Sequence, residues 1–130
     1  MKEIKLSIKT SNNKYSIIIG SKLISKLKEI FLKNSIYSGK YLIVLDSKVP
    51  KFFLKKIVNS LKNKKKFFFV LRANEINKNQ KSVNKILEVL LKNNFNRNDC
   101  LISVGGGITG DVSGFAASIF KRGIKFVNIP

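Results

Sequence analysis

The sequence contains no histidine, one cysteine and two prolines among its 130 residues. The absence of histidine excludes imidazole metal ligands, Ser/His and Cys/His nucleophilic pairs, and the usual general base at neutral pH. Because Cys100 has no second cysteine to pair with, no internal disulfide can form, which favours a reducing compartment such as the cytoplasm. No apolar run approaches the roughly 18 residues of a membrane span, and the N-terminus lacks the continuous apolar segment of a secretory signal.

Acidic residues are also scarce, since 7 Asp and Glu face 26 Lys and Arg and leave a net charge of +19. Such a balance normally indicates a nucleic-acid or membrane surface. However, the only arginines are Arg72, Arg97 and Arg122, whereas nucleic-acid readers favour arginine for bidentate contacts. Lys, Asn and Ile have AT-rich codons, so we interpret the charge mainly as genome composition. A non-enzymatic basic binding module remains the least favoured hypothesis.

Hydrophobic residues make up 44% of the chain, enough for the core of one domain. Residues 2–9 and 15–19 have strand patterns around a turn at 11–13, which predicts an N-terminal β-hairpin. Strands are then expected to alternate with helices, and Ser21 is expected to cap the first helix. The strands are predicted at 41–45, 67–71, 101–104 and 124–129, and the helices at 22–33, 50–63, 79–94 and 111–122. Two of these strands, 41–45 and 67–71, are continuously apolar and are expected to be buried. The alternation predicts an α/β fold, a mostly parallel sheet with helices on both faces.

Three glycines form the strongest local motif. Gly105, Gly107 and Gly110 satisfy G-x-G-x-x-G after a predicted strand and before a predicted helix. Glycines permit a tight turn and let the backbone approach a pyrophosphate, while the N–H groups of the helix N-terminus face the negative charge. The motif alone leaves dinucleotide binding and a tight structural turn equally open. A Walker A loop is excluded, because no Lys-Ser/Thr follows the glycines.

Three charged residues near predicted element ends have alternative interpretations. Asp111 at the helix start is either a cap or a carboxylate that hydrogen-bonds a cofactor. Asp46 follows a central strand, where α/β folds place ligand contacts, but it also fits an Asx turn. Arg122 at a helix C-terminus either complements the helix dipole or binds an anion.

Residues 97–130 resemble the signature region of the 3-dehydroquinate synthase family. The pattern includes R-x-D, GGG-x-x-GD-x-x-GF-x-A, RG and a final proline. The matching residues are Arg97, Asp99, Gly105 to Gly107, Gly110, Asp111, Gly114, Phe115, Ala116, Arg122, Gly123 and Pro130. Upstream, Glu75-x-x-Lys78 and the position of Asp46 fit the family more loosely.

The resemblance implies a Rossmann-like N-terminal domain followed by a mostly helical C-terminal domain that is absent here. We therefore expect residues 1–130 to be the NAD-binding part of a longer enzyme, truncated at its C-terminus. The family converts the seven-carbon phosphate DAHP to 3-dehydroquinate and phosphate, a lyase step of the shikimate route to aromatic amino acids. It uses NAD and a divalent metal, zinc or cobalt, and is commonly a homodimer. A sister sugar-phosphate cyclase or a glycerol-dehydrogenase-like NAD enzyme is the alternative.

The resemblance also implies residue roles. Gly106 and Gly107 would approach the NAD pyrophosphate, and Arg122 would help bind the substrate phosphate. The other expected cofactor contacts are Asp46, Glu75, Lys78, Gly105, Thr109, Gly110 and Asp111. Thr109 and the pair Ala73-Asn74 depart from the family pattern. The metal ligands and catalytic lysines of the family have no counterparts here, so we expect no catalytic residue and no turnover from this chain alone. Among its many cations, only Lys78 and Arg122 receive specific roles.

Overall fold

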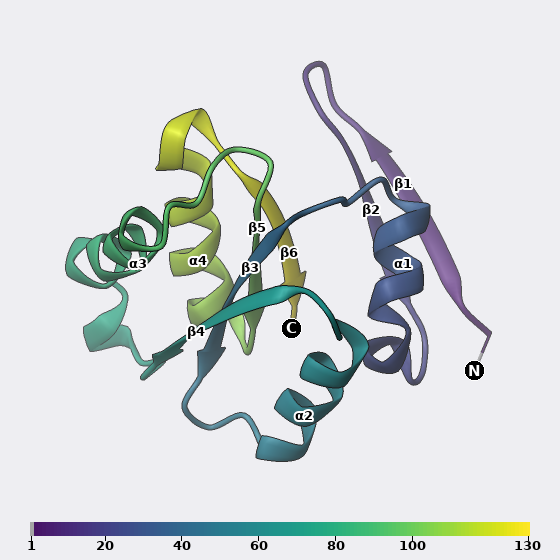
Figure 1. Cartoon of the computed structure of the whole chain (residues 1–130), viewed down its shortest axis with the longest axis horizontal. Helices are drawn as coiled ribbons and strands as arrows, with labels where there is room; N and C mark the ends of the chain where they lie inside the picture. Colours follow the sequence, from purple (N-terminus) through teal and green to yellow (C-terminus); the bar gives the residue numbers. More distant parts are fainter. Residues whose placement is uncertain (1) are drawn as a thin grey trace.

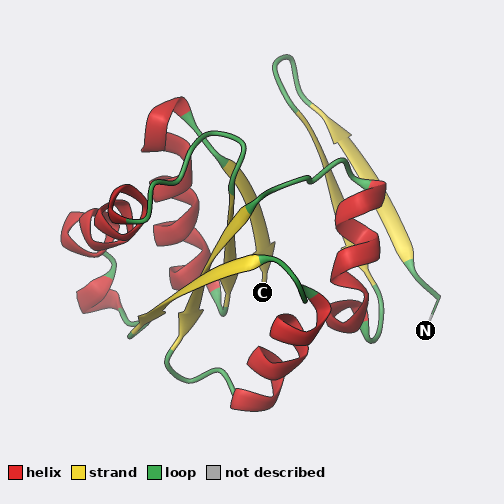
Figure 2. Ribbon diagram, in the orientation of Figure 1, coloured by secondary structure: helices red, strands yellow, loops and turns green. Residues whose placement is uncertain are grey.

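The computed structural model describes residues 2–130. An N-terminal hairpin leads into a helix, after which strands and helices alternate along the chain (Figures 1 and 2). The strands are β1 (Ile4–Lys9), β2 (Lys14–Ile19), β3 (Lys40–Asp46), β4 (Lys65–Leu71), β5 (Cys100–Val104) and β6 (Lys125–Ile129). The α-helices are α1 (Leu27–Lys33), α2 (Lys51–Ser60), α3 (Gln80–Lys92) and α4 (Gly107–Ile119). Short 3-10 turns are η1 (Leu23–Lys26), η2 (Glu75–Asn77) and η3 (Phe120–Arg122).

The main sheet has the strand order β4-β3-β5-β6, and all its neighbouring strands are parallel. Helices α3 and α4 cover one face, and α1 and α2 cover the other (Figure 1). Alternate residues of a strand point to opposite faces, so Leu42 and Val44 join the α3–α4 core while Ile43 joins the α1–α2 core. This confirms the α/β fold with a mostly parallel sheet and an N-terminal hairpin.

Strand β4 differs from the expectation. Strand β3 is buried on both faces, as predicted, but β4 lies at the edge of the sheet, and its Phe68 and Val70 are 46% and 61% exposed. Phe67 and Phe69 on the other face pack against the α3–α4 core. The prediction that residues 67–71 form a buried strand is therefore wrong, because Phe68 and Val70 point to the α1–α2 face but do not join its core.

Two helix starts also differ. The last helix begins at Gly107 rather than near residue 111, so the second half of the glycine motif forms its first turns. Residues 23–26 form the 3-10 turn η1 before α1 begins at Leu27. Lys22 rather than Ser21 precedes η1, with φ 58° and no side-chain cap. The expected Ser21 cap is wrong, because a left-handed residue separates Ser21 from the first turn.

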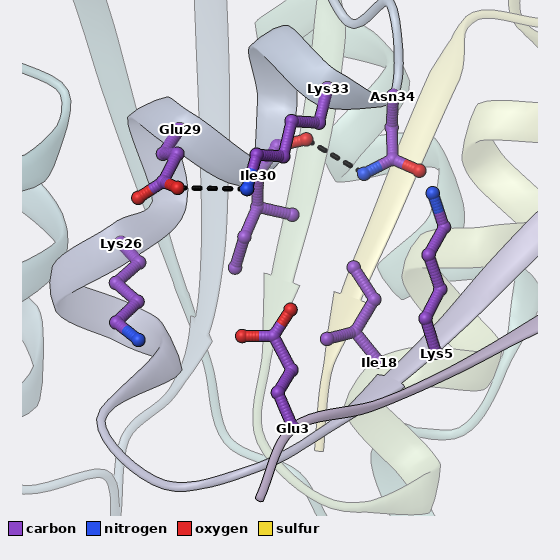
Figure 3. Close-up of a pocket in the computed structure, with 8 residues that line it drawn as sticks. All are labelled: Glu3, Lys5, Ile18, Lys26, Glu29, Ile30, Lys33 and Asn34. Carbon is purple, nitrogen blue, oxygen red and sulfur yellow. Dashed lines mark hydrogen bonds and ion pairs between the residues drawn. The ribbon is translucent and has the colours of Figure 1, made fainter.

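One face of the hairpin is apolar and exposed. The register pairs Ile4 with Ile19 and Leu6 with Ile17, which puts all four on one face at 42–49% exposure. The opposite face is turned toward α1, where Ile18 and Ile30 line a common pocket (Figure 3). Contiguous exposed apolar surfaces commonly mark interaction sites.

Several lysines bind the carbonyl groups left free at helix ends. Lys40 Nζ donates to the carbonyl oxygens of Asn93 and Asn94 at 2.9 and 2.6 Å, just beyond α3. Lys66 Nζ donates to the Leu61 carbonyl at 2.9 Å, at the end of α2. The C-terminus of a helix has unsatisfied carbonyls and a partial negative charge, so cations stabilise it. These lysines have structural roles that the sequence did not reveal.

Within residues 2–130, no helix has the length and apolar character needed to cross a bilayer.

Candidate functional site

The carboxyl ends of the four parallel strands meet at one edge of the sheet. The chain leaves β3 for β4 on one side and later returns to β5 on the other side. The direction of winding therefore reverses between β3 and β5, and open α/β sheets bind ligands at such a switch point. Asp46 ends β3, and Gly105 directly follows β5 at this point. The fold thus brings together two residues that are far apart in the sequence.

Gly105 occupies a position that only glycine fits without strain. Its φ is +149°, and a β-carbon there would lie 2.9 Å from Thr109 Oγ1 and 3.0 Å from Asp46 Cβ. Its backbone N–H donates to the Ile129 carbonyl at 3.0 Å, which ties the loop to the end of β6. Gly105 is therefore packed tightly on its inner side.

The next two glycines are open. A β-carbon on Gly106 or Gly107 would meet no atom of residues 2–130 within 4 Å. Gly106 precedes the first turn of α4 and has no side chain to cap the helix, so the N–H groups of that turn are available to an anion. A tight inner side and an open outer side make a cradle that fits a pyrophosphate. The structure therefore fits a dinucleotide at this loop.

An ion pair joins the connection after β4 to helix α4. Lys78 Nζ lies 3.0 Å from Asp111 Oδ2, and both side chains are partly exposed. The hydrogen bond and the charge of Asp111 raise the pKa of Lys78 above its usual value, and Glu75 adds to the effect. The connection is ordered by two asparagine caps, since Asn74 Oδ1 accepts from Asn77 N and Asn79 Oδ1 accepts from Ser82 N. The Glu75–Lys78 element is thereby held beside the glycine loop.

Thr109 and Gly110 both face the protein rather than solvent. Thr109 is fully buried beneath Gly105, so its side chain packs against the loop from inside. A β-carbon on Gly110 would lie 3.1 Å from Asn128 Oδ1, a polar side chain near the end of β6. Sequence reasoning missed Asn128, although a polar residue inside the apolar run FVNI was a usable signal. The cofactor contacts expected of Thr109 and Gly110 stay predictions.

Arg122 is not brought to this edge. It follows the C-terminus of α4, and a helix of 13 residues is about 20 Å long, so Arg122 lies at the opposite end from the glycine loop. Its backbone is strained, because Lys121, Arg122 and Gly123 have φ values of 44°, 67° and 106° in succession. Its role toward a substrate phosphate stays a prediction, and within one chain it does not join the other site residues.

Two further features are separate from this edge. A shallow pocket lies between the hairpin and α1 (Figure 3), and an ion pair of 2.9 Å joins Glu29 and Lys33 at its rim. Its carboxylates are surrounded by lysines. The residues around it are Glu3, Lys5, Ile18, Lys26, Glu29, Ile30, Lys33 and Asn34. Across residues 2–130, no group of three or more His, Cys, Asp or Glu is arranged to hold a metal ion.

Comparison with known proteins shows a resemblance to one family. A family model described as 3-dehydroquinate synthase N-terminal matches residues 68–130. The curated 3-dehydroquinate synthase of Pelagibacter ubique is 54% identical over 127 residues, which cover 98% of this chain and 34% of that protein. Over nearly its whole length the chain is similar to 3-dehydroquinate synthases. The enzyme of Prochlorococcus marinus subsp. pastoris is 38% identical and is covered over 37% of its length. The chain thus spans about a third of the dehydroquinate synthases it matches.

Solved structures of related enzymes have the same fold as this chain. A 2-deoxy-scyllo-inosose synthase complexed with carbaglucose-6-phosphate, NAD+ and Co2+ superposes with a TM-score of 0.86. It is 22% identical, and the match covers 98% of this chain and 35% of that one. A 2-epi-5-epi-valiolone synthase from Streptomyces hygroscopicus subsp. jinggangensis 5008, with NAD+ and Zn2+ bound, gives 0.65 at 24% identity over 76% of this chain and 28% of that one. The curated relatives favour dehydroquinate synthase over these sister cyclases.

Proposed function

We propose that residues 1–130 are the N-terminal NAD-binding domain of a 3-dehydroquinate synthase, which converts DAHP to 3-dehydroquinate and phosphate. The observation that carries the proposal is the glycine cradle. Gly106 and Gly107 are open on their outer side at the switch point of the sheet, where α4 begins. A chain of this family with an anion-binding helix terminus at that place is suited to hold a dinucleotide.

Each side chain of this edge has a proposed task toward NAD. The N–H groups of Gly106 and Gly107 bind the pyrophosphate, and Asp111 accepts a hydrogen bond from the cofactor. Asp46, Glu75 and Lys78 contact the adenosine side, while Gly105 and Gly110 allow close backbone packing. When bound, NAD supplies transient oxidation of a substrate hydroxyl. Away from this edge, beyond the C-terminus of α4, Arg122 with its planar fork is proposed to bind the substrate phosphate.

The test is NAD binding to the 130-residue chain by titration calorimetry. We expect Gly106→Ala to weaken NAD binding about tenfold or more, because its methyl group occupies the space that the pyrophosphate needs. The melting temperature should stay unchanged, since the new methyl meets no atom of residues 2–130. Gly39→Ala is the matched control, because its methyl has only an ordinary contact of 3.9 Å at the opposite edge. Equal NAD affinity of Gly106→Ala and the wild-type chain would contradict the proposed site.

We further propose that these 130 residues do not turn over DAHP by themselves. The family's reaction requires a divalent metal, and the sequence offers no histidine to bind one. Release of inorganic phosphate from DAHP, measured with NAD and zinc present, should not exceed the rate without protein. Clear phosphate release above that rate would show that the chain contains a complete catalytic site.

The remaining properties of the full-length protein are proposals as well. We propose a cytoplasmic homodimer that takes DAHP as its small-molecule substrate, with no membrane or nucleic-acid partner. The lone cysteine supports the compartment. The alternative, a basic binding module, predicts that the chain binds nucleic acid. The affinity should then fall steeply as the salt concentration rises, because the contacts are to phosphates.

A further inference from the structure

Thr109 lies where the two halves of the proposed NAD site meet. Its side chain is 0% exposed, although it belongs to the first turns of α4 beside the open glycine loop. The point that a Gly105 β-carbon would occupy is 2.9 Å from Thr109 Oγ1 and 3.0 Å from Asp46 Cβ. The Thr109 side chain therefore packs against the inner side of the glycine loop, on which the end of β3 also packs.

The hydroxyl of Thr109 has no hydrogen-bond partner among residues 2–130. A buried hydroxyl without a partner destabilises a fold relative to a methyl group of the same shape. Valine has that shape, so threonine here is unfavourable for the free chain. A buried polar group that stays unpaired in one state requires an explanation, and a partner in another state is the simplest.

The glycine loop itself supplies that partner. A threonine in a helix commonly donates its hydroxyl to the carbonyl four residues earlier, which for Thr109 is the carbonyl of Gly105. Gly105 is in an extended conformation with φ +149°, which precedes the helix rather than continuing it. A rotation of the peptide between Gly105 and Gly106 would turn this carbonyl toward Thr109. It would also turn the Gly106 N–H, one of the proposed pyrophosphate donors.

We propose that Thr109 is a positioning residue for the glycine loop, whose hydroxyl donates to the Gly105 carbonyl when a dinucleotide is bound. The bond orients the Gly105–Gly106 peptide so that its N–H faces the pyrophosphate. Thr109 thus acts on the cofactor through the loop, without touching it. This inference rests on the proposed function, because it assumes that the loop binds NAD.

Ser113 provides a matched control in the same helix. It lies one turn beyond Thr109, is also 0% exposed, and its hydroxyl also lacks a partner among residues 2–130. Its own earlier carbonyl is that of Thr109, inside α4 and not in the loop. Removal of the Ser113 hydroxyl therefore reports what an unpaired hydroxyl does to stability alone.

The experiment measures thermal unfolding without ligand and the Kd for NAD, on the 130-residue chain and three variants. Thr109→Val should raise the melting temperature by about 3–6 °C and weaken NAD binding about five- to tenfold. Thr109→Ser retains the hydroxyl and should keep NAD affinity within about twofold of wild type. Ser113→Ala should leave NAD affinity unchanged. The opposite signs for stability and affinity in Thr109→Val are a signature that a purely structural threonine does not produce.

The outcomes separate the inference from the proposed function. If Thr109→Val binds NAD as tightly as the wild-type chain, the positioning role is wrong and the NAD site stands. If Thr109→Val loses stability together with affinity, the hydroxyl is already paired in the free chain, which also overturns the inference. If the wild-type chain shows no NAD binding, the proposed function fails and the inference fails with it.

Discussion

Gly105→Ala should lower the free energy of unfolding by about 2–4 kcal/mol. A φ of +149° is a conformation that residues with a β-carbon rarely adopt, so alanine must strain its backbone or move the loop. The added methyl would also lie 3.0 Å from Asp46 Cβ and 3.1 Å from Thr109 Cβ, two atoms close to the backbone that cannot easily move aside. Urea denaturation followed by circular dichroism measures the change.

Gly107→Ala is the control for this substitution. Gly107 is the first residue of α4, and a methyl there would meet no atom of residues 2–130 within 4 Å. Alanine reduces the entropy of the unfolded chain and favours the helix, so stability should stay equal or rise by up to about 1 kcal/mol. Wild-type stability in Gly105→Ala would contradict the tight inner packing of the loop.

Asp99→Ala should lower the free energy of unfolding by about 2–4 kcal/mol. The side chain is only 3% exposed, and each carboxylate oxygen accepts one backbone N–H. Asp99 Oδ2 accepts from Asn96 N at 2.8 Å, and Oδ1 accepts from Lys40 N at 3.2 Å. These bonds join the turn before β5 to the start of β3. Alanine leaves both partly buried N–H groups without their charged acceptor, which is what makes the loss large.

Two further variants make the Asp99 result specific. Asn98→Ala removes an exposed neighbouring side chain and should change stability by less than about 0.5 kcal/mol. Asp99→Asn keeps one carbonyl oxygen and should lose about half as much as Asp99→Ala. If Asp99→Ala and Asn98→Ala unfold at the same urea concentration, the two hydrogen bonds do not contribute as described.

The α/β fold was predictable because hydrophobic period and turn residues are local. The apolar run of β3 and the glycine motif after β5 each identify their element from a few neighbouring residues. Element ends were less predictable. The helix predicted from residue 111 begins at Gly107, because open glycines can adopt helical backbone angles as well as loop ones. The run at 67–71 was read as buried because composition does not distinguish a central strand from an edge strand.

The candidate site was likewise predictable only in part. The glycine motif and Asp46 could be proposed from their sequence context, and the fold places them together at the switch point. The Lys78–Asp111 ion pair, 33 positions apart in the chain, could not be derived from either residue's neighbours. The burial of Thr109 was equally hidden, since a threonine after a glycine loop reads as a ligand contact. Arg122 matched the family motif but lies at the other end of α4.

By itself, the sequence determined the fold class, and it contained the resemblance to dehydroquinate synthases and the glycine loop proposed as the site. Each is encoded in short-range patterns of glycine, charge and apolar spacing. Only the tertiary structure decided which side of that loop is packed and which is open. It also showed that lysines such as Lys40 bind carbonyl groups at helix ends. The net charge of +19 alone had suggested only a basic surface. The physical reason is that packing and hydrogen-bond partners come from residues distant in the chain, and strand order alone brings them into contact.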